Sequence, residues 1–242
     1  MKKQIDFPAG MTLLDAAKDP NTKRIEQLLR NGADVNQRSE NGWSALMTAS
    51  CYGCKEVVEV LIMNGANIDF ADKNCGGQTT LMWAARSGRS PKQKVKMLIA
   101  AGADIYKTTD RGSDLLMSAA GSGNTEVVEL LLGLGMKPDA VNENGYTALM
   151  AAAGKGSPKI IELLIAAGAK VNAVDNRKRT ALMFAANGFD EGETIDSLLK
   201  FGANPNLKDS EGLTALDRCR DSQNANSEKR FKLLKTAMNS KK

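Results

Sequence analysis

The chain has 242 residues, a net charge of +5 and no histidine, and aromatic residues make up only 5% of it. It therefore lacks the side chain most often used as a general base, and it contains no GxSxG motif, no P-loop and no cluster of metal ligands. We expect no enzyme, no catalytic or metal-binding residue and no cofactor. No apolar stretch is long enough to cross a membrane, so none is expected to do so.

A leucine recurs along the whole chain in steps of 32, 35, 35, 33, 33 and 34 residues. A period in the low thirties that is kept from end to end predicts a stack of repeats, each packed on its neighbours, in place of a globular domain. The seven positions are Leu14, Leu46, Leu81, Leu116, Leu149, Leu182 and Leu216.

The residues before each leucine predict a turn followed by a helix start. Four residues before it stands a glycine, which tolerates the positive φ of a tight turn, except in the sixth repeat, where Lys178 takes this place. Two residues before it stands a side chain whose oxygen can cap a helix. The seven predicted caps are Thr12, Ser44, Thr79, Asp114, Thr147, Thr180 and Thr214.

A second helix is predicted in the first six repeats. A β-branched residue precedes an aliphatic pair by three and four positions, as in Val128, Leu131 and Leu132, and this spacing places all three on one helical face. A glycine three residues past the pair is suited to end the helix in a left-handed conformation. These glycines are Gly32, Gly65, Gly102, Gly135, Gly168 and Gly202.

Together these features resemble the ankyrin repeat, and residues 142–174 follow the pattern of that family nearly position by position. The resemblance implies an all-α solenoid of antiparallel helix pairs with β-hairpin fingers. We expect one ankyrin-repeat domain over residues 1–242. Its predicted parts are an N-terminal capping repeat, 6–38, five inner repeats, 39–71, 72–108, 109–141, 142–174 and 175–208, and a C-terminal capping repeat, 209–242.

Two substitutions distinguish this chain from the family pattern. The proline of the motif is mostly alanine, and the histidine is methionine in all five inner repeats. Methionine fills irregular core space, so we interpret this row as packing and not as a metal or oxidation-sensing site. The resulting TALM form resembles bacterial ankyrin repeats. The five residues are Met47, Met82, Met117, Met150 and Met183.

Four cysteines are present, and Cys51 and Cys54 form a CxxC motif across the turn inside the second repeat. A redox pair or half of a zinc site are two possible functions of this motif. A zinc site needs further ligands that Cys75 and Cys219, on a finger and in the last repeat, are not placed to supply. We therefore expect free thiols in a reducing compartment, while a regulatory Cys51–Cys54 disulfide stays an alternative.

Insertions interrupt the period at four places. The third repeat is lengthened in its finger, 72–78, and in its turn, 88–93; the sixth carries a longer loop, 187–193, and the last a polar connector, 221–228. Surface loops accept insertions at low cost, so neutral drift and a role in binding both account for them.

In the ankyrin family, partners usually contact the finger tips and the concave face of the first helices. Exposed aromatic side chains beside arginines on this surface are candidates for binding hot spots. By position, Trp83 and Phe184 lie further inward and are expected in the core. The predicted partner-binding residues are Trp43, Tyr52, Gln78, Arg86, Arg111, Tyr146, Lys155, Arg177 and Arg179.

Two functions agree with this surface. The first is a non-catalytic protein–protein interaction scaffold, a monomer whose partner is another protein with an acidic segment. The alternative is a sensor of a ligand or single-stranded nucleic acid that uses the same aromatic and basic residues. The basic C-terminus is short and has no interleaved aromatics, so we interpret it as a solvated cap. The first residues lack the apolar core of a signal peptide, and we expect a cytoplasmic protein, or a secreted or periplasmic one if a signal has been removed.

Overall fold

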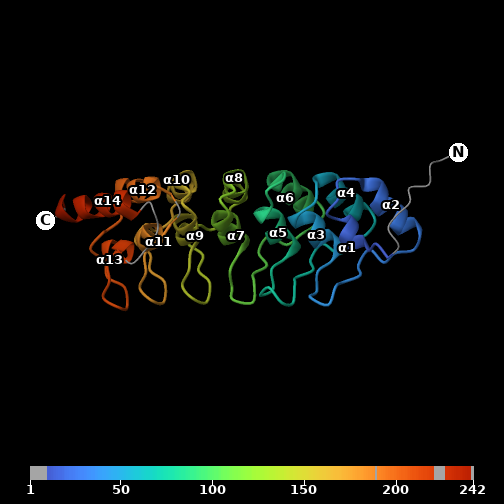
Figure 1. Cartoon of the computed structure of the whole chain (residues 1–242), viewed down its shortest axis with the longest axis horizontal. Helices are drawn as coiled ribbons and strands as arrows, with labels where there is room; N and C mark the ends of the chain where they lie inside the picture. Colours follow the sequence, from blue (N-terminus) through green and yellow to red (C-terminus); the bar gives the residue numbers. More distant parts are fainter. Residues whose placement is uncertain (1–9, 189, 221–226, 241–242) are drawn as a thin grey trace. The chain divides into compact units, whose positions relative to one another are not determined.

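The computed structural model describes residues 10–188, 190–220 and 227–240. The chain divides into two compact units, residues 1–107 and 108–242. The expectations about the start of the chain and about most of the connector 221–228 lie outside the described residues. Each unit is built from pairs of helices that are joined by a short turn (Figure 1).

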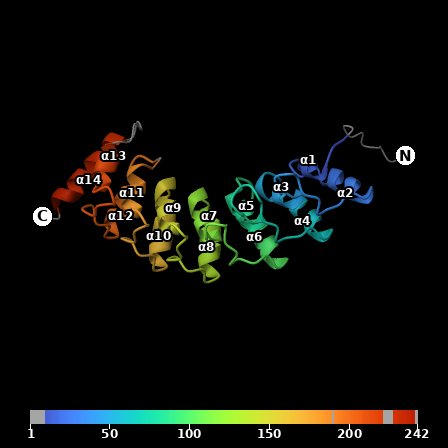
Figure 2. The ribbon, with the colours of Figure 1, turned by 90° about the horizontal axis from the view of Figure 1, so that it is seen from below.

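The first unit contains three helix pairs. The first helices of its repeats pack on one another in the order α1, α3, α5, and the second helices pack in the order α2, α4, α6 (Figures 1 and 2). Its helices are α1 (Leu13–Ala16), α2 (Thr22–Arg30), α3 (Ala45–Cys51), α4 (Lys55–Met63), α5 (Thr80–Arg86) and α6 (Pro91–Ala100).

The second unit contains four helix pairs with the same arrangement. The first helices pack as α7, α9, α11, α13 and the second helices as α8, α10, α12, α14. The bounds are α7 (Leu115–Ser122), α8 (Thr125–Gly133), α9 (Ala148–Lys155), α10 (Pro158–Ala166), α11 (Ala181–Ala186), α12 (Glu193–Lys200), α13 (Ala215–Arg220) and α14 (Ser227–Ser240). Each of the seven predicted repeats therefore contains one helix pair, and the repeat boundaries themselves stay predictions.

All seven predicted helix caps are confirmed. Each side chain accepts a hydrogen bond from the backbone amide three residues later, as Thr147 does from Met150 at 3.2 Å. The two outermost first helices add a reciprocal bond, in which an aspartate accepts from the backbone of the cap, Asp15 from Thr12 and Asp217 from Thr214. These aspartates occupy the position of the inner methionines, so the end repeats exchange a core side chain for a helix-capping one.

The predicted turn residues also have the expected backbone. The glycines before the first helices and after the second helices have positive φ throughout, and Lys178 takes the same left-handed conformation with φ of 57°. A side chain in this conformation is strained, so the sixth repeat keeps the turn at a cost in stability. The fingers that follow are hairpin loops, and their pairing within the described residues is limited to isolated β-bridges at three of them.

The core lies between the two rows of helices. The five inner leucines of the ladder and the five methionines are buried, which confirms their interpretation as packing. Leu14 and Leu216, at the two ends of the ladder, are only half-buried. The end repeats have a neighbour on one side only, and this explains the difference.

Candidate functional site

In the fingers that follow the first repeat, a polar residue at the start of the finger accepts hydrogen bonds from the backbone amides of that finger. Where this residue is an aspartate, one carboxylate oxygen accepts backbone amides of its own finger. Asp72 accepts from Cys75 at 2.8 Å, Asp175 from Arg177 and Arg179 at 2.9 and 2.8 Å, and Asp209 from Glu211 and Leu213 at 2.9 and 3.0 Å. We call Asp72, Asp175 and Asp209 the finger aspartates; all three are buried.

The second oxygen of each finger aspartate holds a side chain on the surface of the first helices. Asp72 accepts from the indole Nε1 of Trp83 at 3.0 Å. Asp175 and Asp209 accept instead from the Nε of Arg179 and of Arg218, both at 2.8 Å. The fingers therefore hold an aromatic ring in the first unit and guanidinium groups in the second.

In the first unit, Trp43, Tyr52, Trp83 and Arg86 form what we call the aromatic cluster. The centroids of Trp43 and Trp83 are 4.7 Å apart, those of Trp43 and Tyr52 are 6.1 Å apart with nearly parallel planes, and the Arg86 guanidinium lies 5.6 Å from the Trp83 centroid. The Tyr52 side chain is 56% exposed, Arg86 is exposed, and both tryptophans are half-buried. Two predicted residues, Trp43 and Tyr52, thus stack directly, and Trp83, which was not predicted for the site, links Arg86 to them.

The expectation that Trp83 is a core residue is wrong. Its position two residues after Leu81 lies at the side of α5 that faces the fingers, where Asp72 binds its indole nitrogen. Gln78, also predicted for the site, is half-buried in the same finger. Its Oε1 is buried and has no hydrogen-bond partner among the described residues.

The CxxC motif lies near a buried lysine that sequence reasoning missed. Lys94 on α6 has no exposed surface, and its Nζ donates to the carbonyl of Ser50 at 3.0 Å and to Ser87 Oγ at 2.9 Å. Burial lowers the pKa of Lys94 to about 8, against a smaller opposite influence of the two thiols. Burial also raises the pKa of Cys51, which makes its reactive thiolate scarcer at neutral pH. Cys51, Cys54 and Cys75 are free thiols, so the two cysteines of the motif are not joined by a disulfide.

In the second unit, Tyr146 and Arg179 meet at Phe184. The rings of Tyr146 and Phe184 are edge to face at 5.2 Å, and the Arg179 guanidinium lies 4.6 Å from the Phe184 centroid. Burial raises the pKa of Tyr146. Phe184 is half-buried, so the expectation of a core position is wrong here as well, for the same reason as at Trp83.

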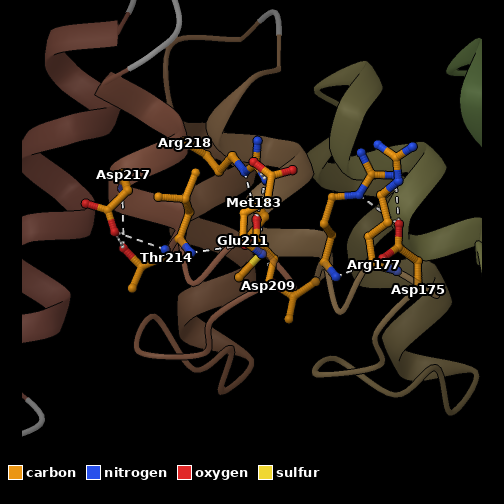
Figure 3. A network of polar contacts seen from close by, with 11 residues as sticks. Asp175, Arg177, Met183, Asp209, Glu211, Thr214, Asp217 and Arg218 are labelled. Carbon is orange, nitrogen blue, oxygen red and sulfur yellow. Dashed lines mark hydrogen bonds and ion pairs between the residues drawn. The ribbon is translucent and has the colours of Figure 1, made fainter.

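A second arginine that the sequence reasoning missed lies beside this group. Arg218 on α13 bonds to Asp209 and to Glu211, at 2.6 and 3.1 Å from its terminal nitrogen (Figure 3). Burial raises the pKa of Asp209, but hydrogen bonds from Arg218 and from the Leu213 and Glu211 amides outweigh it and hold the pKa below its usual value. Arg218 stands two residues after its ladder leucine, as Trp83 and Phe184 do, and reading that position across the repeats reveals all three.

A small pocket of about 40 Å³ lies between the two arginines. It is lined by Arg179, Met183, Phe184, Asn187 and Arg218.

The other predicted residues of the second unit, Arg111, Lys155 and Arg177, are exposed. Their side chains make no hydrogen bond or ion pair with any residue that the structure describes. They are basic groups available to a partner, but the structure does not bring them into one cluster with Tyr146 and Arg179.

The remaining expectations concern metals and membranes. Among residues 10–188, 190–220 and 227–240, no group of three or more cysteine, aspartate and glutamate side chains is placed to hold a metal ion. None of the helices in these ranges is both long enough and apolar enough to span a membrane.

Comparison with protein families gives three matching segments. The family described as "Ankyrin repeats (3 copies)" matches residues 13–109 and 91–175, and that described as "Ankyrin repeats (many copies)" matches residues 164–219. The crystal structure of the human ASB11 ankyrin repeat domain superimposes with a TM-score of 0.78, covering 94% of this chain and 97% of that one at 24% identity. This likeness shows the fold.

Curated relatives match over shorter stretches. "Ankyrin repeat domain-containing protein SAT10" of Stachybotrys chartarum is 35% identical over 108 residues, 45% of this chain and 5% of that protein. "Ankyrin repeat, SAM and basic leucine zipper domain-containing protein 1" of Ornithorhynchus anatinus is 31% identical over 130 residues, 48% of this chain and 27% of that protein. The matched part is therefore a minor portion of each relative.

Proposed function

The chain belongs to the ankyrin repeat family, whose repeats generally mediate protein–protein interaction, and on this premise we propose that it is a non-catalytic scaffold. It binds a polypeptide partner, as a monomer, through its fingers and first helices.

The aromatic cluster carries this proposal. Trp43 directly precedes the cap of α3 and Tyr52 directly follows its last residue, so both rings are attached to one short, capped helix. Trp83 is fixed between Trp43 and Asp72. Rigid, partly exposed aromatic rings beside an arginine lose little freedom on binding, and such side chains dominate the energetics of interfaces.

The exposed basic residues of the second unit give the partner its expected charge. Arg111, Lys155 and Arg177 are exposed, and their charges are not paired within the described residues. Exposed charges of one sign steer a partner of opposite charge and raise the rate of association. An acidic segment in the partner is the complement of this surface.

We do not propose nucleic-acid binding. Arg179 and Arg218 are paired with buried aspartates, which reduces the positive charge that a phosphate backbone requires.

The experiment compares what the full chain captures before and after the aromatic cluster is removed. We expect the triple variant Trp43→Ala, Tyr52→Ala, Arg86→Ala to lose at least one protein that the unaltered chain captures from the source cells. Loss of a hot-spot residue weakens binding by about 2 kcal/mol, or roughly 30-fold. Captured proteins are identified by mass spectrometry, and circular dichroism checks that the variant is folded.

A matched control removes one aromatic, one methionine and one arginine side chain elsewhere in the same unit. The control is the triple variant Arg30→Ala, Met63→Ala, Tyr106→Ala, and all three of these residues are exposed. It is expected to capture the same proteins as the unaltered chain. Identical capture by the control and by the cluster variant would contradict the proposal.

A further inference from the structure

We propose that the pocket between Arg179 and Arg218 binds one carboxylate group, that of a glutamate or aspartate side chain in a protein partner. This inference rests on the proposed function and deepens it, because it assigns a specific receptor to the acidic segment. The pocket lies entirely within the second unit.

Both guanidinium groups are held in place by finger aspartates. Arg179 uses its Nε and one terminal nitrogen on Asp175, at 2.8 and 2.7 Å, while Arg218 uses its Nε and one terminal nitrogen on Asp209, at 2.8 and 2.6 Å. The finger aspartates are themselves fixed by backbone amides. The arginines are therefore oriented before any ligand arrives, and less conformational entropy is lost on binding.

Donors remain on both groups. The other terminal nitrogen of each guanidinium makes no hydrogen bond within the described residues, and neither does the exposed side-chain amide of Asn187. A guanidinium presents its N–H groups as a planar fork that matches the two oxygens of a carboxylate. The remaining terminal nitrogen of each guanidinium and the amide of Asn187, all at one pocket, are a suitable donor set for this group.

The size and lining of the pocket limit the ligand. A volume of about 40 Å³ holds a small polar head group and not a ring. Phe184 and Met183 form an apolar wall, and the Arg179 guanidinium lies over the Phe184 ring. Hydrogen bonds to an anion are stronger beside an apolar wall of this kind than in open water.

The charge balance favours a carboxylate over a phosphate group. Asp175 and Asp209 each neutralise one arginine, so the pocket offers N–H donors whose positive charge is already balanced. A singly charged carboxylate is accommodated by such donors, whereas a doubly charged phosphate requires more uncompensated positive charge.

Glu211 does not line the pocket, but it already binds Arg218 beside it. Its carboxylate lies 3.1 Å from Arg218, and its side chain is 58% exposed. An exposed ion pair of this kind contributes little and opens easily. The negative charge of Glu211 is therefore expected to compete with a partner's carboxylate at Arg218.

The test uses the full chain and two short probes, acetyl-Gly-Glu-Gly-amide and its neutral counterpart acetyl-Gly-Gln-Gly-amide. The NMR signals of the Nε–H groups of Arg179 and Arg218 are followed as each peptide is added. We expect the glutamate peptide to shift both signals and to saturate in the millimolar range, and the glutamine peptide to leave them unchanged. No shift, or equal shifts with both peptides, overturns the proposal.

Inorganic phosphate is titrated in the same way. Tighter binding of phosphate than of the glutamate peptide overturns the assignment to a carboxylate, and weaker binding supports it.

Two variants leave the arginines in place and change the affinity in opposite directions. Glu211→Gln removes the competing charge and is expected to raise the affinity for the glutamate peptide about threefold, because one exposed ion pair changes an affinity by less than tenfold. Asn187→Ala removes a donor and is expected to weaken it by a similar factor. Glu143→Gln, at an exposed glutamate on another finger of the same unit, is the matched control and is expected to have no effect.

Failure of this proposal is distinguishable from failure of the proposed function. If the peptide does not bind while the aromatic-cluster variant still loses captured proteins, only the carboxylate pocket is wrong. If the peptide binds but capture never depends on the aromatic cluster, the proposed function loses its main support and the pocket stands.

Discussion

The finger aspartates bind different kinds of side chain in the two units. In the first unit, Asp72 binds the neutral indole of Trp83, and the surface beside it is aromatic. In the second unit, Asp175 and Asp209 bind guanidinium groups, and the surface beside them carries charge. In all three fingers, backbone amides of the finger fix one carboxylate oxygen, so the residue that meets the second oxygen changes the chemistry of the surface without changing the fold.

The largest expected loss of stability is in the second unit, at Asp209. Asp209→Ala removes four hydrogen bonds that two backbone amides and Arg218 donate to a buried carboxylate, and it leaves Arg218 half-buried with only Glu211 as partner. Breaking a buried ion pair in this way costs about 3–4 kcal/mol of unfolding free energy, which denaturant titration measures.

The depressed pKa of Asp209 gives the same prediction a pH dependence. A carboxyl whose folded pKa lies below its unfolded value stabilises the protein above about pH 4, and that contribution is lost as the pH falls through the folded value. Asp209→Ala is expected to reduce this acid sensitivity. Asp110→Ala, at an exposed aspartate in a finger of the same unit, is expected to change neither the unfolding free energy nor its loss at acid pH. An equal loss of unfolding free energy in both variants would mean that Asp209 is an ordinary surface residue.

Lys94 provides the contrast to Arg218, because it is a buried cation with no carboxylate partner among the described residues. Its folded pKa of about 8 lies below the unfolded value of 10.5, so between these values the unfolded chain binds a proton that the folded chain does not. The unfolding free energy is therefore expected to rise with pH across this window, by roughly 3 kcal/mol.

The variant Lys94→Met is expected to remove this rise. Denaturant titrations at pH 7.5 and 10 measure the unfolding free energy of each protein, and a difference of about 1 kcal/mol between the two pH values is the smallest that counts as a rise. Lys96→Met, one exposed lysine further along α6, is the control and keeps the rise. A rise that persists in Lys94→Met would show that the buried lysine is not its source.

A smaller loss of stability is expected in the first unit, at Asp72. Asp72→Ala removes the acceptor for the Trp83 indole and for the Cys75 amide, at a cost of about 2 kcal/mol. The cost is lower than at Asp209 because no charged partner is left behind. Asp104→Ala, which removes an exposed acceptor for a backbone amide in the same unit, is expected to cost less. A larger loss of unfolding free energy in Asp72→Ala than in Asp209→Ala would contradict this order.

The smallest effect is at the turn where the second unit departs from the repeat pattern. Lys178→Gly relieves a left-handed backbone and is expected to stabilise the chain by about 0.5–1 kcal/mol. Lys178→Ala keeps the strain and is the control. Gly145→Ala, at the equivalent turn of the preceding repeat, is expected to destabilise, because its Cβ would lie 2.9 Å from Asn176 Oδ1. Thermal unfolding resolves these changes, and equal melting temperatures for the two Lys178 variants would refute the assignment of strain.

The sequence was sufficient for the parts of the fold that depend on neighbouring residues. A cap such as Thr147 and a turn glycine such as Gly145 act on backbone groups within a few positions, so their spacing alone predicts their roles. A stack of helix pairs followed from the repetition of those local signals, and the resemblance to the ankyrin repeat implied its fingers.

The candidate site was predictable only in part. Trp43 and Tyr52 were found because their positions in the repeat are exposed, but Trp83 and Phe184 were assigned to the core and Arg218 to the solvated C-terminal cap. All three are directed by aspartates or rings from a finger, and Lys94 is held by Ser50 of the preceding repeat. Such contacts depend on how separate segments meet, which a single repeat pattern does not encode.

The aromatic cluster has a practical consequence for how this chain is observed. Its two tryptophans are the only two in the sequence, and both belong to the first unit. Intrinsic tryptophan emission is therefore a spectroscopic reporter of that unit alone, whereas the far-ultraviolet signal of the helices averages over both. A chain without an added dye thus reveals whether its halves melt together or one after the other.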